Sequence, residues 1–292
     1  MPIKNRDGFV ITDDGTPIYY ETSGRLYPST TVVFCDGIGC DGYIWKYLHR
    51  VLKEDYRILH SHYRGHGKTK APNNPDSVSI QNLADDVIAM MDACQTEKAI
   101  LFGHSMGVQV VLEAFRRHKK RVSGMVLLCG SHSNPVRTFR GRDTLSHMMP
   151  WIRKVVDGIP NISHLLWRKL IPSMLAYRLA TKVEINGRLI QQEDFFPYLE
   201  GIARVDVRLF LKMLSAAENH SAKDILSSID VPTFIIAGAK DSFTPMSLSV
   251  DMHKRIKKSE LFVVEEGSHT APIERSLEVT SRVDAFLLKH FK

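Results

Sequence analysis

The chain of 292 residues is 43% hydrophobic and 24% charged, a composition that is typical of a globular protein and excludes a disordered or fibrous one. Its net charge of +7 is scattered and comes without a helix-turn-helix or aromatic-rich RNA-binding signature, so we expect no nucleic-acid partner. No apolar run approaches the ~20 residues that cross a membrane, and the first residues lack the apolar stretch of a signal peptide, so we expect a cytoplasmic protein.

The segment of residues 10–24 places an Asp-Gly turn between two alternating runs, which predicts a β-hairpin. Short apolar runs follow and predict the buried strands of a mostly parallel sheet. These runs are residues 30–35, 56–62, 98–103, 123–129, 232–238 and 260–266. Apolar residues at helical spacing occupy residues 79–94, 106–118, 245–257 and 273–290. The alternation predicts an α/β fold with helices flanking the sheet.

The alternation is interrupted over residues 135–220, where several amphipathic helical patterns occur without a convincing strand. We therefore divide the chain into a core of residues 1–134 and 221–292 and an inserted helical cap, or lid, of residues 135–220. The insertion carries 13 Lys/Arg against 8 Asp/Glu. Two interpretations of this charge stay open: a solvated helical surface, or a weak attraction to anionic substrates or lipid surfaces.

The motif GHSMG, from Gly103 to Gly107, fits G-x-S-x-G and joins a predicted strand to a predicted helix. A sharp strand-to-helix turn exposes a serine hydroxyl above the sheet edge, and small neighbours relieve the crowding. The backbone N–H of Met106, at the start of the helix, then points to a developing oxyanion. We interpret Ser105 as a nucleophile; the alternative is an ordinary helix-capping serine in a glycine-rich turn.

With this motif the chain resembles the α/β-hydrolase family, from the first hairpin to the last helix but not in the insertion. That family carries an acid after a later strand and a histidine after the last strand. Asp241 follows the run of residues 232–238, and His269 follows the run of residues 260–266. The resemblance implies that His269 is the general base for Ser105 and that Asp241 orients it. The alternatives are a loop-capping aspartate and a surface or helix-capping histidine.

The family's second oxyanion donor comes from the loop after the run of residues 30–35. This loop usually begins His-Gly, but here Asp36 precedes Gly37. The backbone N–H of Ile38 can donate whatever side chain stands at the first position. Asp36 and Gly37 are candidate pocket residues, and the bracing of the loop stays open. Residues 63–69 resemble the family's Arg-Gly-x-Gly loop, which supports the oxyanion loop.

Further candidate pocket residues are His132, near the carboxyl edge of the sheet, and large apolar side chains of the insertion. A lid of this length cannot bury all of its large side chains against itself, so several should face an apolar pocket. The candidates from the insertion are Met148, Trp151, Trp167 and Phe210. If these residues line the pocket, activity on esters should rise from acetate to a medium-chain optimum.

The resemblance implies a serine hydrolase, carboxylesterase-like or lipase-like, that cleaves an ester with an apolar acyl group through an acyl-enzyme. Carbon–carbon bond hydrolysis, lactone opening, thioester cleavage and perhydrolysis are alternatives, because a fold does not select the reaction. A binding protein without catalysis is a further alternative. The four cysteines lack metal-ligand spacing and the sequence has no HExxH motif. We expect no metal, no cofactor and a small-molecule apolar ester as partner, and leave the oligomeric state open.

Overall fold

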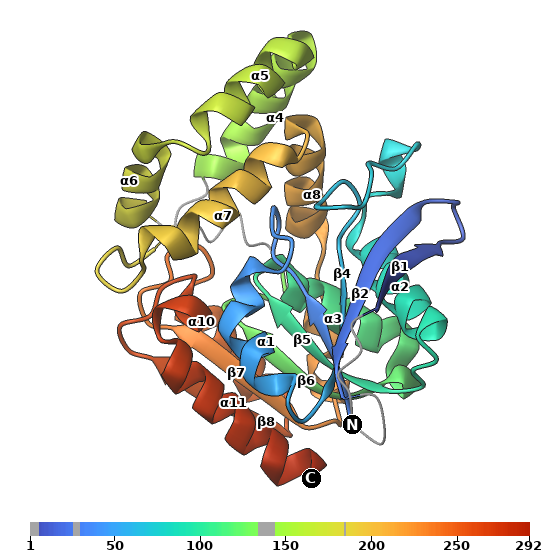
Figure 1. Cartoon of the computed structure of the whole chain (residues 1–292). Helices are drawn as coiled ribbons and strands as arrows, with labels where there is room; N and C mark the ends of the chain where they lie inside the picture. Colours follow the sequence, from blue (N-terminus) through green and yellow to red (C-terminus); the bar gives the residue numbers. More distant parts are fainter. Residues whose placement is uncertain (1–5, 26–29, 134–143, 184) are drawn as a thin grey trace.

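A central sheet organises the molecule (Figure 1). The computed structural model describes residues 6–25, 30–133, 144–183 and 185–292. Within them, eight strands lie in the order β1-β2-β4-β3-β5-β6-β7-β8. The strands are β1 (Arg6–Ile11), β2 (Pro17–Gly24), β3 (Thr31–Cys35), β4 (Arg57–Ser61), β5 (Ala99–His104), β6 (Val122–Leu128), β7 (Thr233–Gly238) and β8 (Ser259–Val264). β2 pairs antiparallel with β1 and β4, and every other pairing is parallel, which confirms the predicted hairpin and mostly parallel sheet.

Helices cover both faces of the sheet because successive strand residues point to opposite sides. Val33, Leu101 and Ile235 pack into the core under α2, α3 and α9. Phe34 and Phe102 pack into the opposite core under α1 and α11. The helices of the core region are α1 (Lys46–Leu52), α2 (Ile80–Ala93), α3 (Met106–His118), α9 (Met246–Arg255), α10 (Ala271–Glu274) and α11 (Ser276–Phe291).

Two details differ from the sequence prediction. Helix α1 was not predicted, because its seven residues give too short a periodic pattern. The helix expected over residues 273–290 is divided between α10 and α11, at Arg275. The remaining short elements are the 3₁₀ helices η1 (Tyr43–Trp45), η2 (Pro75–Ser77), η3 (Lys119–Arg121) and η5 (Lys223–Ser228).

The inserted part of the chain forms helices that gather at one end of the sheet (Figure 1). They are α4 (Thr144–Gly158), α5 (Pro160–Leu170), α6 (Met174–Val183), α7 (Gln192–Arg204) and α8 (Val207–Asn219). α7 contributes Phe195 and Leu199 to one core of the sheet, and α8 contributes Leu209 and Met213 to the other. The division into core and cap stays a prediction, and its boundary after residue 134 lies outside the described residues. Of the helices described, none has the length and apolar character needed to cross a membrane.

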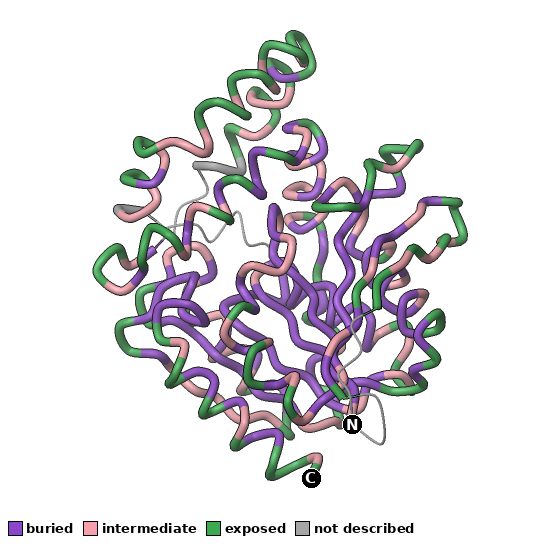
Figure 2. Tube along the Cα trace, viewed as in Figure 1, coloured by how far each residue is buried: buried purple, intermediate pink, exposed green. Residues whose placement is uncertain are grey.

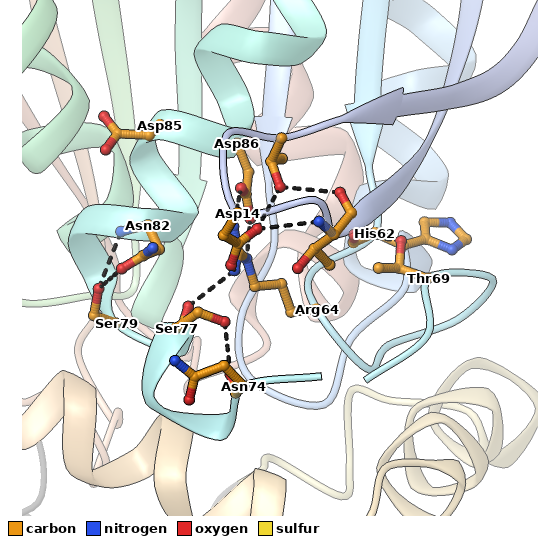
Figure 3. Close-up of polar contacts among 12 residues, drawn as sticks. Asp14, His62, Arg64, Thr69, Asn74, Ser77, Ser79, Asn82, Asp85 and Asp86 are labelled. Carbon is orange, nitrogen blue, oxygen red and sulfur yellow. Dashed lines mark hydrogen bonds and ion pairs between the residues drawn. The ribbon is translucent and has the colours of Figure 1, made fainter. Parts of the chain in front are cut away.

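A buried arginine ties the hairpin to the helical layer (Figure 3). Arg64 follows β4 and is 2% exposed. Its guanidinium donates two hydrogen bonds to the carboxylate of Asp86 on α2, at 2.7 and 2.8 Å. It also pairs with Asp14 in the hairpin turn and donates to the carbonyl oxygen of Ser77. Because each buried charge has a partner, charge-assisted hydrogen bonds offset the free-energy cost of removing these charges from water.

Removal of the Asp86 carboxylate should destabilise the fold strongly, because it leaves Arg64 buried with its main partner missing. We expect Asp86→Ala to lower the free energy of unfolding by about 3–5 kcal/mol in urea titrations. Asp85→Ala is the matched control: the Asp85 side chain points away from Arg64 in Figure 3 and pairs with the exposed Arg117. Its loss should be about 0–1 kcal/mol. Equal losses in the two variants would contradict the structural role of Arg64.

Candidate active site

Ser105 occupies the turn between β5 and α3 in a backbone conformation that is strained for a side-chain-bearing residue, with φ 55° and ψ −119°. Close packing holds it there. A Cβ atom on Gly107 would lie 2.0 Å from the carbonyl oxygen of Cys35, and one on Gly103 would lie 2.5 Å from the carbonyl oxygen of Gly107. Both positions of the motif therefore require glycine, and the turn presents the Ser105 hydroxyl at the end of the strand.

Three side chains from distant parts of the sequence form one hydrogen-bonded chain. The Oγ atom of Ser105 lies 2.9 Å from Nε2 of His269, and Nδ1 of His269 lies 3.0 Å from Oδ2 of Asp241. Asp241 lies in the loop after β7 and His269 in the loop after β8, and both are buried. A carboxylate at Nδ1 favours the tautomer with the proton on Nδ1, which leaves the Nε2 lone pair facing the hydroxyl.

The loop around Asp241 holds its carboxylate in one orientation. Oδ1 accepts hydrogen bonds from the backbone N–H groups of Phe243 and Thr244, each at 2.8 Å. Oδ2 accepts a hydrogen bond from the Thr244 hydroxyl at 2.8 Å, beside its contact with His269. These donors fill the lone pairs of the carboxylate, so the side chain cannot rotate away from the imidazole without losing several bonds.

His104 and Glu274 position the segment that carries His269. The Nε2–H of His104 donates to the backbone carbonyl of His269 at 2.9 Å. Burial, with the neighbouring His269, lowers the pKa of His104 to about 3, so the ring is neutral. On the other side, Glu274 accepts hydrogen bonds from the Ser268 backbone N–H at 2.7 Å and from the Thr270 hydroxyl at 3.0 Å. Sequence reasoning missed Glu274, whose position at the end of α10 gives no signal of this role.

The loop after β3 is braced by a buried ion triad. Asp36 is fully buried; its Oδ1 accepts a hydrogen bond from the Trp45 indole at 2.6 Å, and its Oδ2 contacts Nε2 of His60 at 2.8 Å. Nδ1 of His60 contacts Glu21 at 3.3 Å. Burial opposes a charge on His60, but the carboxylates of Asp36 and Glu21 outweigh it and raise the pKa of His60 to about 10. Asp36 therefore fixes the loop after β3 to β4 through His60. Its side chain is fully buried, which corrects the expectation that it lines the pocket.

The same loop is supported by residues that follow β4. Nε2 of His66 accepts the backbone N–H of Gly39 at 3.0 Å, while its Nδ1–H donates to the carbonyl of Arg64 at 3.1 Å. Burial lowers the pKa of His66, in keeping with a neutral ring. Residues 37–42 also fit the pattern G-x-G-x-x-G, but the Gly39 N–H is used by His66. A Cβ on Gly37 would lie 3.2 Å from Cβ of Ser105, so the loop passes directly over the serine.

Ile38 and Met106, the expected oxyanion donors, line one small cavity with Ser105. The cavity has a volume of about 20 Å³, which is room for about one water molecule. Its other lining residues are Gln109, Ser131, Leu214, Ala217 and Phe243. Sequence reasoning missed these five. Phe243 could have been predicted, because it lies two residues after Asp241 in the same loop. Leu214 and Ala217 could not, because only the packing of α8 in the folded chain brings them to the cavity at Ser105.

His132 lies away from this cavity. Its Nε2 contacts Oδ2 of Asp251 on α9 at 3.1 Å, and its Nδ1 contacts the hydroxyl of Ser133 at 2.9 Å. The ring is buried, and that burial lowers its pKa. His132 therefore fastens the chain after β6 to α9, which differs from the expected pocket position.

The large apolar residues named from the insertion do not line the Ser105 cavity either. The Trp167 indole donates to the carbonyl of Ile202 at 2.9 Å, and its ring lies 5.0 Å from that of Phe210, so these side chains join the inserted helices to one another. Met148 and Trp151 are 47% and 66% exposed on α4. The expectation failed because helix–helix packing uses some of these residues and leaves others at the surface.

One cluster away from Ser105 has the composition of a metal site. Ligand atoms of Glu21, His60 and His62 lie within 4.8 Å of one another. However, both ring nitrogens of His60 already contact carboxylates, and Nδ1 of His62 accepts the Lys68 backbone N–H at 2.9 Å. The hydrogen bonds thus favour the ion triad over coordination. The large cavity beside it, of about 670 Å³, has none of the Ser105 cavity residues in its lining.

Comparisons with known proteins identify the family of the fold. A family model described as alpha/beta hydrolase fold matches residues 30–276. The uncharacterized hydrolase YugF of Bacillus subtilis is 24% identical over 287 residues, which cover 94% of this chain and 96% of that protein. An enol-lactonase from Burkholderia xenovorans is 20% identical with a TM-score of 0.78, over 96% of this chain and 100% of its own. An esterase from Exiguobacterium antarcticum is 23% identical with a TM-score of 0.77, over 96% and 98%.

The Asp36–His60 pair predicts a pH-dependent stability. Because the pKa of His60 rises from 6.5 to about 10 on folding, its contribution is fully present below pH 6.5 and is lost as the pH rises towards 10. We expect the free energy of unfolding to fall over this range in the wild type and to fall less in Asp36→Asn. Asp41→Asn, on the same loop but paired with the exposed Arg204, should keep the wild-type slope. Parallel pH profiles for Asp36→Asn and wild type would rule out the triad.

Proposed function

Because this chain belongs to the alpha/beta-hydrolase family, we propose that it is a serine hydrolase that cleaves a carboxylic ester through an acyl-enzyme intermediate. The hydrogen-bonded chain from Ser105 through His269 to Asp241 carries the proposal. A serine hydroxyl needs a base to become a nucleophile near neutral pH, and an imidazole needs an orienting carboxylate. The similar structures include an enol-lactonase, an esterase and, with a TM-score of 0.76, a meta-cleavage product hydrolase, so they support hydrolysis without selecting the bond that is cleaved.

In the proposed reaction, Ser105 attacks the carbonyl carbon while His269 accepts the hydroxyl proton at Nε2. The carbonyl oxygen becomes an oxyanion, and the backbone N–H groups of Ile38 and Met106 would stabilise it. The tetrahedral intermediate collapses, the acyl–oxygen bond breaks, and His269 returns the proton to the departing alcohol. Water then attacks the acyl-enzyme with the same base, which releases the acid and restores Ser105. Asp241 stays ionised throughout and orients the imidazole.

The size of the cavity favours a short acyl group. A volume of about 20 Å³ at Ser105 accepts no long chain unless α8 moves, because Leu214 and Ala217 close that side. This revises the expected medium-chain optimum: we propose that activity falls from acetate onwards. The lining stays mostly apolar, with Phe243 beside the His269 ring at 5.3 Å, so the proposed acyl group is small and apolar.

A fluorophosphonate probe distinguishes a hydrolase from a non-catalytic binding protein. The wild type should be labelled, and Ser105→Ala should lose both labelling and turnover while its circular dichroism and thermal unfolding stay unchanged. Asp241→Asn should lose on the order of 10⁴ in kcat. Ser131→Ala, which removes a second hydroxyl at the same cavity, should still be labelled. Labelling that survives in Ser105→Ala would exclude this serine as the nucleophile.

Enlarging the cavity should shift the acyl preference. We expect Leu214→Ala to raise the kcat/KM ratio of butyrate to acetate p-nitrophenyl esters by about fourfold or more for each extra methylene it accommodates. Leu211→Ala removes the same volume from α8 at a side chain that packs with Val156 and does not line the Ser105 cavity, and should keep the wild-type ratio. An unchanged ratio in Leu214→Ala would show that the acyl group binds elsewhere.

A further inference from the structure

The outer inserted helices expose an unusual amount of apolar surface. In the described part of the chain, eleven of the seventeen large hydrophobic side chains found exposed belong to residues 148–179. Figure 2 shows that α4, α5 and α6 are largely exposed, whereas α7 and α8 beneath them carry buried stretches. Exposed apolar side chains in this number are a common mark of an interaction site in a folded protein.

On α4 the exposed apolar residues share one side of the helix. Met148, Trp151 and Val155 follow a spacing of three and four residues, and Trp151 is 66% exposed. Val156 points the other way and packs with Leu211 of α8. The outer side of α4 is therefore apolar even though its inner side already has a packing partner.

On α5 and α6 the exposed apolar side chains have cations among them. Ile162, Leu165 and Leu166 share one side of α5 with Lys169, at a spacing of three, four and seven residues from the first. On α6, Arg178 lies four residues after Met174, between Leu175 and Leu179 at helical spacing. We call the exposed side chains of residues 148–179 the outer face.

The outer face is strongly basic. Residues 144–183 carry six Lys/Arg and one Asp/Glu, Asp157. Among the described residues, Lys154, Lys169 and Arg178 take part in no ion pair. A partner that covers this face must supply both an apolar phase and negative charge.

These requirements select a lipid surface over a second copy of the chain. In a two-fold dimer the outer face would meet itself, so its cations would approach one another with little acidic compensation. An anionic bilayer offers hydrocarbon to Trp151 and Leu165 and phosphate or carboxylate to Lys169 and Arg178. We propose that the outer face docks the protein on the surface of an anionic membrane, with the helices lying in the plane of the interface.

This proposal concerns a surface contact and does not depend on the reaction at Ser105. The full chain would be sedimented with vesicles of phosphatidylcholine alone and of phosphatidylcholine with phosphatidylserine. Binding should favour the anionic vesicles and weaken steeply as salt is added, because the cations act through a screened field. Each cation removed should lower the partition coefficient about fivefold.

Two pairs of exposed substitutions make the test specific. Trp151→Ser with Leu165→Ser should reduce binding at all salt concentrations, and Lys169→Glu with Arg178→Glu should remove the preference for anionic vesicles. The matched controls are Leu277→Ser, at a position that is 89% exposed on α11, and Lys254→Glu on α9. Controls should bind like the wild type, and thermal unfolding should be unchanged in all variants because the side chains are exposed.

Three results would overturn the proposal. The first is that the wild type fails to bind anionic vesicles at low salt. The second is that the outer-face variants and the controls bind equally. The third is that sedimentation velocity shows a dimer that the Trp151→Ser and Leu165→Ser pair disrupts, which would make a second copy the occupant of the face.

Discussion

The strained turn at Ser105 is the constraint on which the rest of the site depends. A positive φ at a non-glycine residue costs free energy, and the turn persists because strand β5, helix α3 and the loop after β3 meet there without space for larger side chains. Gly107 packs against the carbonyl of Cys35, and Gly37 against Ser105 itself. Strands β7 and β8 end at the same edge of the sheet, so their loops can bring Asp241 and His269 to the serine.

Buried charges hold the loops around this turn, and each is satisfied by specific partners. Arg64 joins the hairpin to α2 with Asp14 and Asp86, and Asp36 joins the loop over Ser105 to β4 through His60. An unpaired charge in such places would be costly, so these groups act as a set and not as independent contacts. These contacts explain why Asp36 can stand where the family usually has a histidine. Its carboxylate fixes the loop, and His60 supplies the opposite charge.

The inserted helices divide into two layers with different physical roles. α7 and α8 pack into the cores on the two faces of the sheet, and α8 closes the cavity at Ser105 with Leu214 and Ala217. α4, α5 and α6 contribute few buried side chains and present apolar and basic ones outward. The inner layer thus limits what reaches the serine, while the outer layer is available to a partner. The proposed acyl selection and the proposed membrane contact would therefore use different layers of these helices.

Local patterns in the sequence determined the strands, most helices and the position of Ser105, because hydrophobic period and the G-x-S-x-G turn are short-range signals. Asp241 and His269 were located from the resemblance to the family, which carries an acid and a histidine after later strands. These patterns did not predict the short helix α1 or the break between α10 and α11 at Arg275. Only the tertiary structure decided which side chains meet. Asp36 contacts His60, His132 contacts Asp251, the Trp167 ring lies beside that of Phe210, and Leu214 lines the cavity at Ser105. Such contacts join residues far apart in the chain, and their partners depend on how the helices pack, which no local pattern encodes.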